Sequence, residues 1–196
     1  SAPGNFTFEE LEQGIKYAHE NDARAYITLN TLPRNNEIAV IDDFIKTAAE
    51  LNPDAFIITD LSAIDKVTKL APNVEAHISV QTGIVNYETA RFYYNLGAKR
   101  IVVARELSLE EIAEIRAKTP KDLEIEAFVH GAICMSVSGR CLLSNYMTGR
   151  DSNHGDCAQP CRWNYRLVEE KRPGEYMPIY EDEQGTYILN AKDMCL

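Results

Sequence analysis

The residues most able to do chemistry are the five cysteines, Cys134, Cys141, Cys157, Cys161 and Cys195. Six residues separate the first two, three separate the next two, and the last is the penultimate residue of the chain. The intervening segment 142–156 reads as a loop with too few apolar residues to hold a fixed shape by packing alone. Thiolates that converge on a metal ion or a cluster would tether it, and we expect such a site here.

The cysteine spacing leaves three kinds of chemistry open. A zinc site usually offers two pairs of closely spaced cysteines, and only one pair here comes near that pattern. Irregular spacing with a distant fourth ligand suits a cuboidal iron–sulfur cluster at least as well, because such clusters take four thiolates. A nucleophilic cysteine would need a neighbouring base, for which His130 and His154 are the candidates.

The composition is that of a globular protein, with 45% hydrophobic and 26% charged residues among 196. The sequence shows neither an apolar run long enough for a membrane span nor a signal-peptide pattern, so we expect a cytoplasmic protein without membrane contact. Cysteines in that compartment, odd in number here, are not expected to form a disulfide framework.

The charge of the chain is unevenly distributed. A net charge of −10 argues against a surface that binds nucleic acid throughout, because phosphates require basic partners. Between Arg140 and Arg172, however, six Lys and Arg residues stand against four acidic ones. This stretch is either a solvated, mildly basic loop or a local site for an anion.

Short apolar strands alternate with amphipathic helices along the first two thirds of the chain. The patterns predict strands at 25–30, 55–60, 76–81, 100–105 and 123–129, and helices from 7 onward and at 38–51, 62–70, 86–96 and 108–118. Such alternation is typical of right-handed βαβ units in a parallel sheet, either doubly wound or part of a barrel. No glycine-rich phosphate loop follows the first strand, which weighs against a dinucleotide-binding sheet. The chain is short for a closed barrel.

The pattern changes after Arg162. Short strands at 163–168, 176–180 and 186–189, joined by turns, predict a small antiparallel appendage that returns the chain to Cys195. The predicted fold is therefore an α/β, partial TIM-like (β/α) barrel over residues 1–133. A cysteine-rich, cluster-binding region with a β hairpin would follow over residues 134–196 and pack on the barrel.

Polar residues stand at or just beyond the carboxyl end of every predicted strand: Asn30 and Thr31, Asp60, Ser79 and Gln81, Arg105 and Glu106, and His130. In parallel α/β proteins this edge of the sheet binds ligands. Any one of these residues could be a helix cap instead, Asp60 and Ser79 above all. The coincidence at five strand ends is the reason to expect a ligand site. His77, in the middle of a strand, more simply reads as a hydrogen-bonded interior residue.

Two long motifs resemble those of the collagenase-like peptidase family U32. One runs from Glu126 through Gly131-Ala-Ile-Cys134 to Gly139-Arg-Cys141, and the other from Gly155-Asp-Cys157 through Cys161-Arg-Trp163 to Asn190-Ala-Lys-Asp-Met-Cys195. The later motifs are most similar to the branch that hydroxylates the wobble uridine of tRNA. The family has further elements before and after the part matched here, and we expect these to complete the barrel and to contribute to RNA binding.

The resemblance implies an iron–sulfur-dependent, oxygen-independent RNA hydroxylase that converts uridine to 5-hydroxyuridine and takes its oxygen from prephenate. The ligands of its 4Fe-4S cluster would by position be Cys134, Cys141, Cys157 and Cys195, with Cys161 as the alternative. Arg105 would clamp a substrate carboxylate through its fork geometry. Glu126 would serve as base or support the cluster loop. The residues that would orient the substrate are Asn30, Ser79, Gln81 and His130.

Two other functions stay open. Proteolysis, which the family name suggests, needs an activated nucleophile or a metal-bound water, and the sequence contains neither His-Glu-x-x-His nor Gly-x-Ser-x-Gly. Ser136 and Ser138 have no evident base partner, and a thiol protease would have to use Cys134 with His130. The third possibility is a structural α/β domain stapled by zinc that binds a partner.

Overall fold

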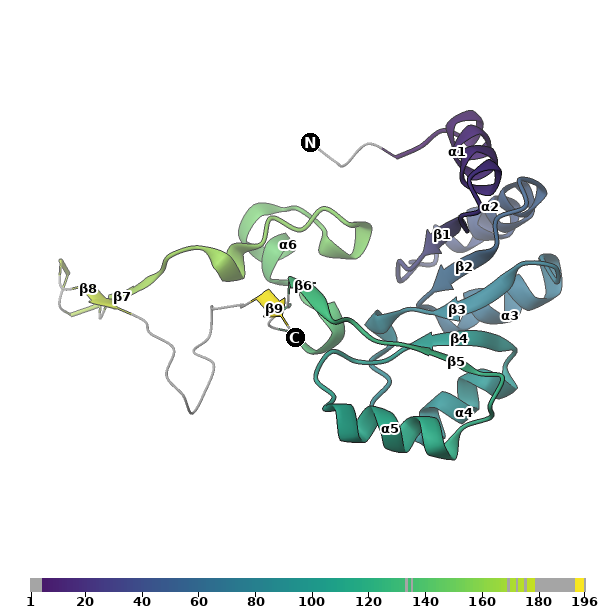
Figure 1. Ribbon diagram of the computed structural model, residues 1–196. Helices are drawn as coiled ribbons and strands as arrows, with labels where there is room; N and C mark the ends of the chain where they lie inside the picture. Colours follow the sequence, from purple (N-terminus) through teal and green to yellow (C-terminus); the bar gives the residue numbers. More distant parts are fainter. Residues whose placement is uncertain are drawn as a thin grey trace. The chain divides into compact units, whose positions relative to one another are not determined.

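The computed structural model describes residues 5–132, 134, 136–168, 170–171, 173–174, 176–178 and 193–195, and the chain divides after Phe128 into two compact units. The boundary expected from sequence lay at residue 133. In chain order, with η for a 3-10 helix, the elements in Figure 1 are α1 (Phe8–Glu20), β1 (Tyr26–Leu29), α2 (Ile38–Glu50), β2 (Ala55–Ile58), α3 (Leu61–Leu70), β3 (Glu75–Ile78), η1 (Val80–Thr82), α4 (Tyr87–Asn95), β4 (Ala98–Val102), α5 (Leu109–Lys118), β5 (Glu124–Glu126), β6 (His130–Ala132), η2 (Val137–Gly139), α6 (Leu143–Thr148), η3 (Ser152–His154), η4 (Pro160–Arg162), β7 (Arg166–Val168), β8 (Tyr176–Pro178) and β9 (Asp193–Cys195).

The first unit contains a parallel sheet of five strands in the order β1-β2-β3-β4-β5. Each strand pairs with the one that precedes it in the chain. A doubly wound sheet reverses its order at a switch point, whereas a (β/α) barrel adds every strand beside its predecessor. The order therefore confirms an α/β fold of the barrel type. In the described part of the chain β1 and β5 remain edges, so the barrel is not closed.

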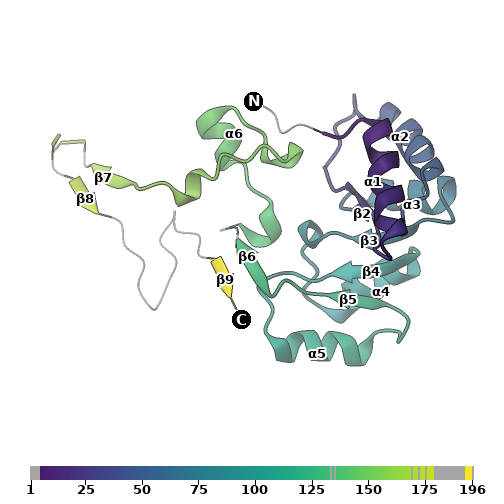
Figure 2. The same ribbon diagram turned by 45° about the horizontal axis from the view of Figure 1, so that its top comes forward.

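The two faces of this sheet differ because successive strand residues point to opposite sides. One face is apolar and packs on the helices, and its strand residues in the core are Ile27, Phe56, Ile58, Ile78 and Ile101. Helices α1 to α5 lie against this face of the sheet (Figure 2). Their buried residues in the same core include Ile15, Ile45, Ile64, Tyr93 and Ile115. Burying a side chain of this size contributes about 1.5–3 kcal/mol. The other face carries the polar residues described below.

Two helices of the first unit begin with a capping box. Thr7 accepts a hydrogen bond from the Glu10 backbone at 3.2 Å, and the Glu10 carboxylate accepts one from the Thr7 backbone at 2.7 Å. Ser108 and Glu111 repeat the arrangement at α5. Asp60, which the sequence allowed as a helix cap, caps α3. Its carboxylate accepts the Ser62 backbone N–H at 2.8 Å, because a carboxylate there reaches the exposed amides of the first turn.

The second unit contains two short antiparallel pairs, β6 with β9 and β7 with β8. The β7–β8 pair confirms part of the predicted appendage. The turn expected at 182–185 and the strand expected at 186–189 lie outside the described residues. The single strand predicted over 123–129 is β5 alone, and β6 begins four residues after β5 ends.

The segment 142–156 is not a plain loop, as its composition had suggested, because it contains α6 and η3. Hydrogen bonds rather than apolar packing hold it. The buried Ser144 hydroxyl accepts the Ala158 backbone N–H at 2.9 Å, and the Thr148 hydroxyl donates to the Ser144 carbonyl at 2.7 Å. Gly149, at φ 73°, ends α6 in the left-handed conformation that glycine tolerates best.

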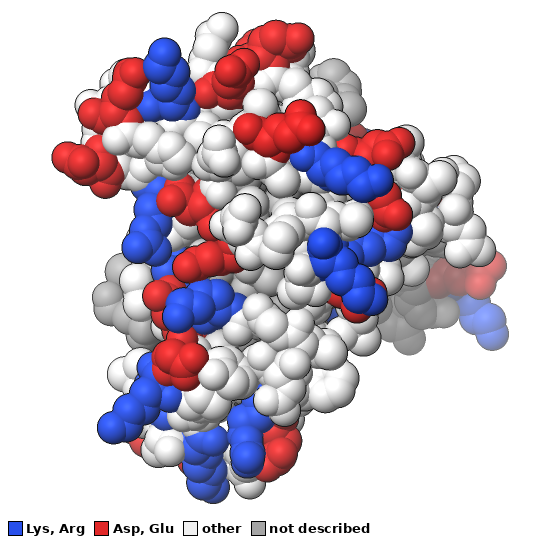
Figure 3. Space-filling view, turned by 90° about the vertical axis from the view of Figure 1, so that its right-hand side faces the viewer, with Lys and Arg blue, Asp and Glu red and all other residues white. Residues whose placement is uncertain are grey.

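Acidic and basic side chains are interspersed over the side of the protein that Figure 3 shows. Mixed charges of this kind give no extended field of one sign, so this side is a poor candidate for binding a polyanion. Within the described ranges, no helix is both long enough and apolar enough to cross a membrane.

Candidate functional site

The carboxyl ends of the five parallel strands lie at one edge of the sheet. Of the residues predicted to form a ligand site, five belong to the first unit and stand at or after the ends of β1, β3, β4 and β5: Asn30, Ser79, Gln81, Arg105 and Glu126. The structure thus places them in strand order along a single edge, which is where (β/α) barrels bind their ligands.

Ser79 is mainly a structural residue. It is 4% exposed, and its hydroxyl caps η1 by accepting the Gln81 backbone N–H at 3.3 Å. The Gln81 side chain is oriented by a residue that the sequence did not single out, because the buried Thr59 hydroxyl donates to its Oε1 at 3.1 Å. Gln81 is therefore better placed than Ser79 to contact a ligand.

Arg105 is oriented by an aromatic ring. Its guanidinium carbon lies 4.4 Å from the ring centroid of Phe128, which follows β5 and is 40% exposed. A cation–π contact of this kind fixes the plane of the guanidinium. A fixed, half-buried guanidinium at the sheet edge suits bidentate recognition of a carboxylate or phosphate. The sequence prediction placed Phe128 inside the strand expected at 123–129 and gave it no role in the site.

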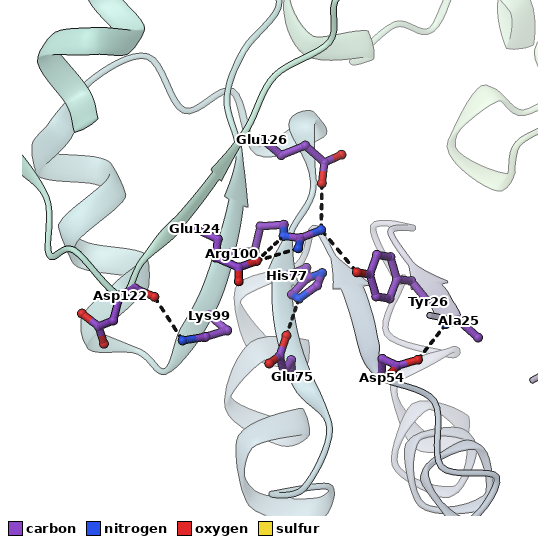
Figure 4. Close-up of polar contacts among 10 residues, drawn as sticks. All are labelled: Ala25, Tyr26, Asp54, Glu75, His77, Lys99, Arg100, Asp122, Glu124 and Glu126. Atoms are coloured by element: carbon purple, nitrogen blue, oxygen red, sulfur yellow. Dashed lines mark hydrogen bonds and ion pairs between the residues drawn. The ribbon is translucent and has the colours of Figure 1, made fainter. Parts of the chain in front are cut away.

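A charged network occupies the sheet face that the helices leave uncovered (Figure 4). Arg100 donates from Nε and Nη2 to Glu124 Oε2 at 2.8 and 2.6 Å, and from Nη1 to Glu126 Oε2 at 3.1 Å. Nη1 also lies 3.5 Å from the Tyr26 hydroxyl on β1. The guanidinium therefore links β4 to β5 and to β1. Sequence patterns did not reveal it, although Arg100 and Glu124 are register partners.

This network shifts two pKa values. Burial of the Arg100 guanidinium opposes its charge, but the hydrogen bond to Glu124 helps to raise its pKa above the usual value. The same bond from Arg100 lowers the pKa of Glu124. Both groups therefore stay ionised. Glu126 is held by the same guanidinium, so a role as base would require its carboxylate to leave Arg100.

His77 is the hydrogen-bonded interior residue that the sequence suggested. It is 1% exposed, its Nε2 lies 2.9 Å from Glu75 Oε2, and its ring packs edge-on against Tyr26 at 4.9 Å. Burial lowers its pKa, with Glu75 acting in the opposite direction. The imidazole is thus kept neutral and stabilises the sheet.

Four cysteines of the second unit share one neighbourhood. Cys134, Cys141 and Cys161 are half-buried and Cys157 is exposed, and all four are free thiols. Burial raises the pKa of Cys161, and negative charge on Cys134, Cys157 and Cys141 raises it further. Cys134, Cys141 and Cys157 therefore lie in the electrostatic surroundings of Cys161.

Two of these sulfurs already accept backbone hydrogen bonds. The Leu143 N–H lies 3.2 Å from Cys141 Sγ, and the Gln159 N–H lies 3.3 Å from Cys157 Sγ. Such bonds favour a thiolate and are a recurrent feature of iron–sulfur ligation. Among the described residues, no three His, Cys, Asp or Glu side chains converge closely enough for a single metal ion. A shared zinc ion or iron–sulfur cluster therefore stays a prediction for these cysteines.

The β6–β9 pair brings the last cysteine back to this region. His130 is the register partner of Cys195, and β6 leads directly into the segment that carries Cys134. The backbone thus places Cys195 beside the cysteine-rich segment from a distant point in the sequence. His130 is exposed, and the other histidine weighed as a base, His154, has its Nδ1 3.1 Å from Asp151 Oδ2.

A surface hollow of about 690 Å³ lies at the opposite edge of the sheet, lined by residues that include Arg24, Asp54 and Glu75. Asp54 there accepts the Ala25 backbone N–H at 2.7 Å and so joins the beginnings of β1 and β2. Amino-terminal edges of parallel sheets rarely carry active sites. This hollow is therefore separate from the predicted site.

A parallel sheet in sequential order, covered by helices on one face and followed by a cysteine-rich segment, defines an α/β protein with a partial, barrel-like sheet and a second, thiol-rich unit. The model of peptidase family U32 matches residues 1–196, and the chain belongs to that family. The solved U32 peptidase Mk0906 has the same fold, with a TM-score of 0.60 and 18% identity over 92% of this chain and 73% of that one.

Two relatives have names that describe RNA modification. The tRNA hydroxylation protein P of Escherichia coli is 39% identical over 96% of this chain and 50% of its own length. The 23S rRNA 5-hydroxycytidine synthase of Escherichia coli is 34% identical over 84% of this chain and 24% of its own length. This chain thus spans about half the length of the first of these relatives.

Proposed function

We propose that this protein is an RNA hydroxylase that converts the wobble uridine of tRNA to 5-hydroxyuridine. The observation that carries the proposal is a sequence identity of 39%, over 96% of this chain, to a protein named for tRNA hydroxylation. A second relative is named for making a 5-hydroxypyrimidine in ribosomal RNA. Both names describe the addition of a hydroxyl group to RNA, which favours the same reaction class here.

We further propose that the second unit holds a 4Fe-4S cluster through Cys134, Cys141, Cys157 and Cys195, with Cys161 as the alternative to Cys157. The N–H bonds to Cys141 and Cys157, and the effect of the neighbouring thiols on Cys161, support this assignment. When bound, such a cluster supplies redox or Lewis-acid chemistry.

In this proposal the oxygen donor is prephenate, a small dicarboxylate, and no molecular oxygen is used. Arg105, fixed against Phe128, would bind one substrate carboxylate in bidentate fashion. Gln81, fixed by Thr59, would hold a second polar group of the substrate. Asn30 would complete the orientation of the substrate at this edge of the sheet. Glu126 would act by supporting this edge, because Arg100 already holds its carboxylate.

The proposal is tested by mass analysis of nucleosides from a strain that lacks the gene, compared with the same strain carrying the full-length gene. We expect 5-hydroxyuridine and its derivatives to be missing from tRNA in the first strain and restored in the second. Unchanged tRNA nucleosides in the deletion strain would refute the proposal. A change in ribosomal RNA nucleosides alone would correct the substrate and keep the reaction class.

A further inference from the structure

The second unit carries a pair of aromatic rings whose role the hydroxylation site does not explain. Trp163 and Tyr165 stack with their planes 20° apart and their centroids 6.4 Å apart. They follow η4, in the stretch that leads to β7 (Figure 2). Alternate residues of extended chain share a side, so the two rings form one surface. Trp163 is 45% exposed, which leaves much of its indole open to solvent.

This aromatic surface is fixed by a contact with α6. The Tyr165 hydroxyl donates to Met147 Sδ at 3.4 Å, which ties the extended segment to that helix. The preceding residue on α6, Tyr146, is 88% exposed, and Leu142 before the helix is 77% exposed. Large rings held in place yet open to water are unusual on a surface that binds nothing.

Basic side chains accompany the rings. Arg162 and Arg166 flank Trp163 and Tyr165 along the chain, and both are exposed. Residues 136–168 contain four arginines and two aspartates, and one aspartate, Asp156, is paired with Arg150 at 2.8 Å. The segment is therefore positive within a chain whose net charge is −10. Of the two interpretations of this basic stretch, the exposed aromatic rings favour an anion-binding surface over a solvated loop.

We propose that Trp163 and Tyr165 form a stacking platform for an unpaired base of the RNA substrate. Arg162 and Arg166 would bind the neighbouring phosphates. This inference rests on the proposed function. Proteins recognise single-stranded RNA by stacking unpaired bases on aromatic rings beside arginine and lysine. RNA would use both features, the rings for an unpaired base and the arginines for the phosphates beside it. The platform would hold the strand that carries the base to be hydroxylated.

The test uses the full-length protein with a single-stranded oligouridine RNA and with a tRNA transcript. Trp163 is the one tryptophan of this sequence. The part of the RNA-dependent fluorescence change that is lost in Trp163→Phe therefore reports on the Trp163 indole alone. We expect oligouridine to quench that signal and a duplex RNA of equal length to leave it unchanged. We expect Trp163→Ala to weaken oligouridine binding roughly 5- to 150-fold, the range for loss of one stacked base. The Trp163→Phe variant keeps an aromatic ring, so its affinity for oligouridine should fall much less.

The matched control is Phe92→Ala, which removes an aromatic ring that is 55% exposed on α4 of the other unit. It should bind RNA like the unchanged protein. Replacing Arg162 and Arg166 by Gln should lower the slope of log affinity against log salt by roughly 0.7 for each residue. An unquenched Trp163, or a Trp163→Ala variant that binds as tightly as Phe92→Ala, would overturn the platform.

The platform and the proposed function can fail separately. A protein that hydroxylates RNA while Trp163→Ala binds RNA normally keeps the function and loses the platform. A protein that binds oligouridine through Trp163 but forms no hydroxylated nucleoside keeps the platform and loses the function. Concentration-dependent self-association that Trp163→Ala abolishes, without any change in RNA affinity, would assign the rings to a protein interface and overturn the proposal.

Discussion

Replacing Arg100 by methionine should destabilise the first unit by a predictable amount. The change removes ionic hydrogen bonds to Glu124 at 2.6 Å and to Glu126 at 3.1 Å while keeping most of the apolar stem. A hydrogen bond to a charged group is worth about 1.5–3 kcal/mol when well shielded. The two carboxylates are 42% and 49% exposed, so solvent screening reduces each contact to about 1 kcal/mol. The expected loss is about 2 kcal/mol, or a fall in Tm of about 4–8 °C for a chain of this size.

The assay is thermal unfolding followed by circular dichroism, with Arg91→Met as the control. Arg91 pairs with Glu88 at 3.5 Å on the surface of α4, with both partners more than half exposed, so its loss should cost less than about 0.5 kcal/mol. In a Glu124→Gln background, Arg100→Met should cost about half as much as in the unchanged protein. Equal costs in the two backgrounds, or a cost for Arg100→Met no larger than for Arg91→Met, would refute the role given to this network.

Three further predictions concern the candidate site and its support. Cys134→Ser should lose iron and acid-labile sulfide from anaerobically purified protein, measured by metal and sulfide analysis, and full retention of both would exclude Cys134 as a ligand. Arg105→Ala should abolish RNA hydroxylation with iron content intact, and loss of the iron as well would show that the role assigned to Arg105 is wrong. His77→Gln should flatten the acid side of the stability profile in pH-dependent melting. The pKa of His77 in the folded protein lies below the unfolded value of 6.5, so its contribution is complete above pH 6.5 and is lost as the pH falls toward the folded pKa. If His77→Gln left the pH dependence of the melting temperature below pH 6.5 unchanged, the contribution assigned to His77 would be wrong.

The sheet and its helices could be predicted from sequence because the signals are local. Each strand is a short apolar run, and each helix follows with an apolar residue every three or four positions. The helix starts predicted at 7 and 108 rest on equally local signals, since each cap residue and its partner lie three residues apart. Pattern alone left the choice between a doubly wound sheet and a barrel open. The sequential strand order settles it.

Contacts between distant parts of the chain could not be predicted in this way. Arg100 meets Glu124 and Tyr26 only because β4 lies beside β5 in register and faces β1 across the sheet. The orientation of Arg105 by Phe128 and of Gln81 by Thr59 likewise depends on neighbouring strands. Helix α6 was missed because hydroxyl hydrogen bonds from Ser144 and Thr148, rather than an apolar stripe, stabilise it.

The cysteines show both what the sequence could predict and what it could not. Their number and irregular spacing pointed to a shared inorganic group, which stays a prediction. In the structure, negative charge on Cys134, Cys141 and Cys157 helps to raise the pKa of Cys161. Sequence alone could not show that β9 pairs with β6, which places Cys195 near the segment that begins at Cys134. The choice between Cys157 and Cys161 as a ligand stays open, and iron analysis of Cys157→Ser and Cys161→Ser would decide it.

The central claim is that the full-length protein transfers an oxygen atom from a small acid to RNA. The most direct measurement supplies prephenate whose hydroxyl carries heavy oxygen, together with tRNA that lacks the modification, under strictly anaerobic conditions. Mass analysis of the tRNA nucleosides should then show 5-hydroxyuridine that contains the heavy isotope. Unlabelled 5-hydroxyuridine would contradict prephenate as the donor. Formation of no 5-hydroxyuridine by iron-replete protein would contradict the proposed reaction itself.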